Sequence, residues 1–277
     1  LYAGGSFERA GSTLARDVAA WDGAAWRALG GDWEIFEVLD TGNEAGTFVE
    51  ALAYAGGELF IGGHFQTIHQ KGASPQDRTS YAWVYHVVGY VPADQTWFML
   101  GEEGLAGVTT DGTSCISTGV HALAAVNGGL YIGGSFNRGG GLRAPALARW
   151  DLRSGAWSSP GAVASTGDPS VRALATSGRV LLVGGVFTSV AGQPARSVAA
   201  LDTATGRWDA LAGGVGWRNG VARVNALALG PGAAYLGGEL SQAGAHPSVG
   251  MARYAGALGG GQSTNAANRV YLPSLGR

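Results

Sequence analysis

Four polar residues occupy the same place in a repeated frame, and their side chains are those of a site for a small polar ligand. The frame is Val-x-Ala-Leu, in which x is Glu50, His121, Arg172 and Asn225 in turn. A carboxylate, an imidazole, a guanidinium and an amide offer opposite charges and one group that titrates near neutrality. We expect the four side chains to surround the mouth of a central channel, where they bind a ligand, pair with one another or are simply hydrated.

Signatures of catalysis and of metal binding are weak by comparison. The five histidines show no paired spacing of the kind that metal ligands adopt. The chain also lacks a Gly-x-Ser-x-Gly elbow and a phosphate-binding loop. We therefore predict no catalytic residue, no metal site and no cofactor.

Two segments of opposite character could bind a partner. Residues 30–50 carry six acidic and no basic side chains, interleaved with aromatic residues that include Trp33 and Phe36. The spacing matches no EF-hand, so a solvated loop or a partner surface is favoured over a calcium site. Residues 216–223 have the reverse polarity, aromatic and basic, and include Trp217 and Arg218. Two such loops could meet head to tail between molecules, and a contact that does not close would build a filament.

A sequence repeat places the four polar residues of the Val-x-Ala-Leu frame at equivalent positions along the chain. Near copies of Leu-Tyr-Ile-Gly-Gly-Ser-Phe recur about 50 to 70 residues apart, a spacing that suits one four-stranded unit each. Short apolar runs cut by glycine turns indicate antiparallel strands. The first glycines of the five copies are Gly4, Gly62, Gly133, Gly184 and Gly237. The predicted repeats cover about 1–48, 49–119, 120–170, 171–223 and 224–257.

The fullest repeat, with Leu130 to Phe136 followed by Trp150-Asp151 and then Trp157, resembles the kelch repeat of galactose-oxidase-like β-propellers. It is also similar to repeats in secreted bacterial proteins. The resemblance implies an all-β propeller of about five four-stranded blades. Kelch-type propellers include enzymes, lectins and scaffolds, so no single activity is implied. Copper chemistry of the oxidase kind would need a cysteine near a tyrosine with histidine ligands, and Cys115 stands without such a motif.

The repeat residues themselves have structural roles in this interpretation. The glycine pairs permit close backbone approach, and the tryptophans fill the wider space between blades. Asp22, Asp151 and Asp202 are predicted to form turns. The longest loops join one blade to the next or strand 2 to strand 3, so they share one face, where binding residues are expected.

The C-terminal segment, residues 258–277, combines a Gly/Ser/Asn linker with the strand-like Val270, Tyr271 and Leu272. The first repeat lacks its first strand and the fifth lacks its fourth. The tail could therefore complete the fifth blade, close the ring on the first, or add a strand to a neighbouring molecule. Because the sequence opens inside a repeat, we expect a processed or truncated form.

Composition narrows the function. The chain is 46% hydrophobic with 49 glycines, has a formal charge of -2, and contains no apolar run long enough for a membrane helix. Nucleic-acid and membrane partners are not expected. We predict a non-enzymatic extracellular or cell-surface protein with an interaction or structural role, which self-associates into oligomers or filaments. The alternatives are a carbohydrate-binding propeller and an oxidase- or hydrolase-type propeller enzyme.

Overall fold

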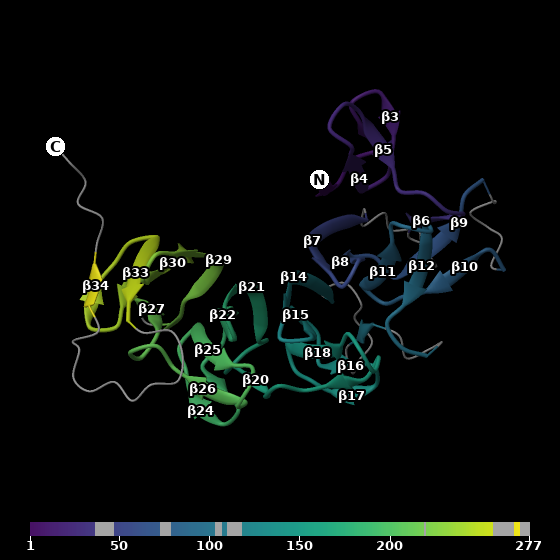
Figure 1. Ribbon diagram of the computed structural model, residues 1–277. Coiled ribbons are helices and arrows are strands. Elements are labelled where there is room, and N and C mark those ends of the chain that lie inside the picture. The colour runs from purple at the N-terminus through teal and green to yellow at the C-terminus, as the bar shows by residue number, and fades with distance from the viewer. Residues whose placement is uncertain are drawn as a thin grey trace.

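The computed structural model describes residues 1–36, 47–72, 79–102, 107–109, 118–218, 220–256 and 269–271. These residues form strands and turns and contain no helix. The strands make ten sheets of two to four strands, and every pairing in them is antiparallel. The all-β class is confirmed, and the many small sheets are consistent with a β-propeller-like fold (Figure 1). None of the residues described here forms a helix long and apolar enough to cross a membrane.

Each repeat contributes one main sheet, which we number by its repeat. In the third, β14 (Gly119–Val126), β15 (Gly129–Ser135), β18 (Leu147–Asp151) and β19 (Trp157–Ser158) pair in that order. We call the first strand of a main sheet its inner strand. The second sheet contains β7 (Phe48–Ala55), β8 (Glu58–His64), β11 (Val87–Val91) and β12 (Thr96–Met99). The fourth contains β21 (Ser170–Ser177), β22 (Val180–Val186), β25 (Val198–Asp202) and β26 (Arg207–Asp209).

The two end sheets differ from this pattern. The first has three described strands, β1 (Tyr2–Gly4), β4 (Val18–Trp21) and β5 (Trp26–Ala28). The fifth has four, β29 (Arg223–Gly230), β30 (Ala233–Glu239), β33 (Met251–Ala255) and β34 (Arg269–Tyr271).

The tail therefore completes the fifth sheet. In β34 the backbone of Val270 lies opposite Tyr254, and that of Tyr271 lies opposite Arg253. The sequence left three placements of the tail open. The structure shows the first of them, in which the tail pairs with the fifth sheet of the same chain. Leu272 lies outside the described residues.

The turns form as their residues require. Asn127 and Gly128 link β14 to β15 with φ angles of 49° and 70°, the conformation that a tight hairpin needs. Asp151 Oδ1 accepts hydrogen bonds from the N–H groups of Arg153 and Ser154. These bonds, with one from Arg149, hold the pKa of Asp151 far below its usual range. Equivalent turns are formed by Asp22 and Asp202. The predicted turn role of the three aspartates is confirmed.

Where the structure describes the long loops, parts of them form short strands that pair in small sheets. In the third repeat, the connection between strands 2 and 3 folds into a hairpin of β16 (Arg138–Gly139) and β17 (Leu142–Arg143), which pairs with β13 (Val108–Thr109) from the link between sheets. Pairing satisfies backbone groups that a covered loop would leave without partners. Similar small sheets contain β6 (Trp33–Phe36), β9 (Thr67–Gln70) and β10 (Tyr81–Trp83); β20 (Val163–Ala164), β23 (Ser189–Val190) and β24 (Gln193–Pro194); and β27 (Val215–Trp217), β28 (Gly220–Val221), β31 (Gln242–Ala243) and β32 (His246–Pro247). A hairpin of β2 (Arg9–Ala10) and β3 (Thr13–Leu14) occupies the corresponding place in the first repeat.

The main sheets pack face to face in sequence order, with a hydrophobic cluster at each of the four junctions. The inner strand of one sheet packs on the inner strand of the next, as β14 does on β21. Figure 1 shows the sheets following one another along an arc, with the purple first sheet and the yellow-green fifth sheet at its ends. Trp157 and Trp208 pack in these clusters, as expected for the repeat tryptophans.

Candidate functional site

The four residues singled out by the repeat frame share one structural feature. Each falls at a β-bulge in its inner strand. There the valine and the alanine of the frame pair with consecutive residues of the second strand of the same sheet, and the residue between them is skipped. A bulge residue is left out of the ladder, so its side chain can be re-aimed without disturbing the pairing on either side. The valine and the alanine of the frame are therefore constant because they pair with the neighbouring strand. The residue between them is unpaired in the ladder and is free to vary. We call Glu50, His121, Arg172 and Asn225 the bulge row.

Two members of the bulge row are in direct contact. Glu50 Oε2 lies 2.6 Å from His121 Nδ1, and His121 Nε2 lies 2.9 Å from the hydroxyl of Ser135. Glu50 comes from the second sheet, whereas His121 and Ser135 come from the third. The contact therefore joins two repeats, and both nitrogens of the imidazole are engaged. Sequence reasoning missed Ser135, although it is the serine of the Gly-Gly-Ser-Phe segment that marks the repeat.

The order of carboxylate, imidazole and hydroxyl is that of an activated serine. Acyl transfer would also need hydrogen-bond donors for an oxyanion. Two backbone amides near Ser135 are engaged within the chain, because Gly134 N–H donates to Ala146 O at 3.1 Å and Asn137 N–H donates to Thr109 O at 3.0 Å. The structure thus shows an imidazole oriented between a carboxylate and a hydroxyl.

Arg172 is the member with a free bonding group. Its Nε is buried and has no hydrogen-bond partner within the part of the chain that the structure describes. A buried donor without an acceptor costs free energy, so this nitrogen favours an acceptor supplied from outside. Asn225 lies exposed on the inner strand of the fifth sheet. The structure thus brings Glu50 and His121 together and carries the row onward through Arg172 and Asn225; a central channel stays a prediction.

A second group of histidines lies close to the row. The rings of His64 and His86 have centroids 6.0 Å apart, and His64 also stacks on Phe48 at 5.4 Å. His86 is 2% exposed, and burial, followed by the neighbouring His64, lowers its pKa to about 3. A neutral buried imidazole fits a packing role. Among the described residues, no group of three or more His, Cys, Asp or Glu side chains is placed to share a metal ion.

The predicted partner residue Trp33 lines a cleft of about 300 Å³. Trp97 and Lys71 lie on its walls, and Trp33 is half-buried instead of projecting from a loop. Trp97 Nε1 donates to Gly30 O at 3.2 Å, and Lys71 Nζ contacts the Leu29 and Gly31 carbonyls. The backbone of Phe36 ends β6, but its side chain is outside what the structure describes.

The other predicted partner pair lies on the surface. Trp217 is 38% exposed, and the guanidinium of Arg218 lies 5.4 Å from the centre of its ring. Arg218 N–H donates to Ser241 Oγ at 2.6 Å, which anchors the turn after β27. Residues 37–46 of the acidic segment are outside the described residues, so a meeting of the two loops stays a prediction.

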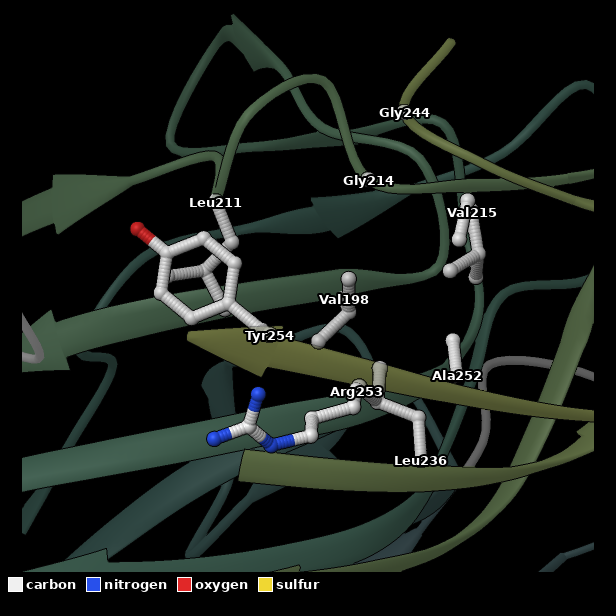
Figure 2. Close-up of a pocket in the computed structure, with 10 residues that line it drawn as sticks. Val198, Leu211, Gly214, Val215, Leu236, Gly244, Ala252, Arg253 and Tyr254 are labelled. Carbon is white, nitrogen blue, oxygen red and sulfur yellow. The ribbon is translucent and has the colours of Figure 1, made fainter. Parts of the chain in front are cut away.

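A further cavity, between the fourth and fifth sheets, is too small for a ligand. It has a volume of about 20 Å³, roughly the room of one water molecule. Figure 2 shows its mostly apolar lining, with Val198 from β25, Leu211 from the adjoining loop, and Tyr254 and Arg253 from β33. This space is a packing gap at a sheet junction.

Comparisons with known proteins give little guidance on function. No family model and no curated protein matches the chain. Among solved structures, the computationally designed Ika4 protein is 14% identical with a TM-score of 0.37, over 72% of this chain and 89% of that one. The extracellular domain of BT4673 from B. thetaiotaomicron is 11% identical with a TM-score of 0.42, over 92% of this chain. The chain spans 30% of that second structure.

Proposed function

We propose that this protein is a non-enzymatic, extracellular or cell-surface interaction protein. In this proposal its sheets are kelch-like propeller blades arranged in an open arc, and the bulge row is its recognition surface. The support is that every complete repeat places a different polar side chain at the same bulge within a constant frame. Variation confined to one side chain of a rigid scaffold is what a binding surface requires.

Arg172 defines the chemistry of the ligand. Its buried Nε offers a donor without an acceptor, and a carboxylate is an acceptor that a guanidinium binds well. At the other end of the bulge row, Glu50 lies 2.6 Å from His121. The carboxylate of Glu50 repels an anion placed at that end. The proposal is therefore a ligand with a carboxylate, such as an acidic glycan or an acidic peptide, seated at Arg172 and extending toward Asn225.

Calorimetric titration with a glucuronate-containing oligosaccharide and with an acidic peptide tests this function. We expect one of them to bind the natural chain, Arg172→Ala to lose that binding, and the exposed-site control Arg143→Ala to retain it. Equal binding by the two variants, or no binding of either probe, would refute the assignment of the row.

A second candidate is glycan binding in the cleft beside Trp33. The observation that favours it is a volume of about 300 Å³ bounded by Trp33 and Trp97, with Glu34 and Lys71 beside them. Aromatic walls with a few polar groups are typical of small-ligand sites. Glycan-array binding that is lost in Trp33→Ala and kept in Arg172→Ala would place recognition in the cleft instead of the row.

A further inference from the structure

The four junctions between main sheets are built in the same way. At each one, the valine of an inner-strand frame fills the space beside the first glycine of the preceding sheet. A Cβ on Gly62 would lie 2.5 Å from Val120 Cγ1, and one on Gly184 would lie 2.7 Å from Val224 Cγ1. The remaining pairs are Gly4 with Val49 and Gly133 with Val171.

The fifth sheet carries the same glycine, and within the part of the chain that the structure describes no other sheet packs on it. A Cβ on Gly237 would meet only Ala226 of its own sheet, at 3.8 Å. Tyr235 is 41% exposed, whereas its counterpart in the third sheet, Tyr131, is 3% exposed. Exposed side chains therefore lie where other sheets have a buried junction. The fifth-sheet face consists of Ala226, Ala228, Tyr235, Gly237 and Met251, with Arg253 opposite Tyr235 at its border.

Met251 shows the same contrast. It lies opposite Gly237 in the ladder and is 50% exposed, whereas Leu147, which lies opposite Gly133, is fully buried. An exposed apolar face that corresponds to a buried one elsewhere in the molecule indicates an interaction surface.

The first sheet carries the matching face. Leu1 is 80% exposed, whereas its counterpart Leu130 is fully buried at the junction of the second and third sheets. Trp21 and Trp26 form a tilted pair at 5.4 Å, and the equivalent pair of the third sheet, at 5.3 Å, packs in that same junction. We call Leu1, Trp21 and Trp26 the first-sheet face. The two faces lie on the end sheets of the arc in Figure 1.

We propose that the fifth-sheet face of one copy of this chain packs on the first-sheet face of a second copy. Like the internal junctions, the contact sets an apolar strand face against a glycine-bearing strand. The first sheet as described has no frame valine, so Leu1 and the two tryptophans supply the apolar surface in its place. Because the two surfaces differ, the interface is heterologous, and successive copies add head to tail into a ring or a filament. The contact is formed by faces, not by donation of the tail strand, and it is separate from the carboxylate site at Arg172.

Gly237→Val gives a precise test. Among the described residues only Ala226 lies beside Gly237, so the valine is tolerated in the single chain but occupies the room that an incoming sheet needs. Gly167→Val is the matched control, because Gly167 also has open space around it and lies in an exposed loop. Matching circular dichroism and thermal midpoints show that both variants fold as the natural chain does.

Light scattering over a range of concentrations provides the readout. We expect the natural chain and Gly167→Val to exceed the mass of one chain, and Gly237→Val to stay at that mass. Leu1→Glu, which alters the opposite face, should also stay at the mass of one chain. Mixing it with Gly237→Val should then give dimers that do not grow, because each variant keeps one intact face.

Three outcomes would overturn the proposal. The natural chain could stay at the mass of one chain throughout, as it would if the two faces close on each other within a molecule. Gly237→Val could assemble as well as the natural chain, or the mixed variants could fail to pair.

Discussion

Val120 fills the space that Gly62 leaves by having no side chain: a Cβ on Gly62 would lie 2.5 Å from Val120 Cγ1. Real Cβ atoms do not approach a neighbour so closely, so the glycine is required by the adjoining sheet and not by a turn. At the four junctions, the first glycine of the recurring Gly-Gly pair thus sets the distance between successive repeats.

Alanine substitutions at equivalent glycines should therefore differ in effect. Gly62→Ala forces Val120 away from its packed position, and we expect it to lower the free energy of unfolding by about 1 to 3 kcal/mol. Gly237→Ala adds a methyl group to open space and reduces the freedom of the unfolded chain, so its effect should lie within about 0.5 kcal/mol of zero or be stabilising. Urea denaturation of the two variants measures the difference. Equal losses would contradict the assigned role of the junction valine.

Burial of His86 should make stability depend on pH. Its pKa is lowered to about 3 in the folded chain, so between that value and about 6.5 the unfolded chain binds the additional proton. Stability should consequently fall as the pH drops below about 6.5, by on the order of 2 to 3 kcal/mol at pH 4.5 from this residue. Burial is the main cause, and His64 and His121 add positive charge nearby when protonated.

The measurement is denaturant unfolding at pH 7 and pH 4.5 for the natural chain, His86→Asn and the exposed control His246→Asn. Asparagine tolerates the left-handed backbone at this position, where φ is 72°. We expect only His86→Asn to flatten the pH dependence. An unchanged slope in that variant would show that His86 is protonated in the folded chain.

The contact between Glu50 and His121 should couple two repeats energetically. A double-mutant cycle with Glu50→Gln and His121→Gln should give a coupling of roughly 1 kcal/mol at neutral pH, because both side chains are partly buried and the distance is 2.6 Å. The more exposed pair Arg223 and Glu239, 3.5 Å apart, serves as the comparison and should show weaker coupling. Independent effects of the Glu50 and His121 substitutions would argue against a joint site.

Local patterns predicted the repeated strands, the aspartate turns and the place of the variable residues near the start of each first strand, because each depends on a few neighbouring residues. The arrangement of the variable residues around a central channel stays a prediction. The contact of Glu50 with His121 and Ser135 was not predictable, since it depends on how one sheet is set against the next. The small sheet of β13, β16 and β17 was also missed. Its strands have two residues each, too short to show an alternating pattern, and β13 pairs with β16 across a long separation in sequence.

The tail offers a final test, because β34 pairs with the outer edge of β33 while the fifth-sheet face lies on the flat side of the same sheet. A chain ending at Gly256 loses β34, so the amides of β33 that pair with it should exchange with deuterium faster, while those of β14 and β15 should not change. Light scattering should show that this shorter chain still assembles, since Gly237 and Tyr235 are retained. Loss of assembly in the shorter chain, together with normal assembly by Gly237→Val, would instead identify strand donation by the tail as the contact between copies.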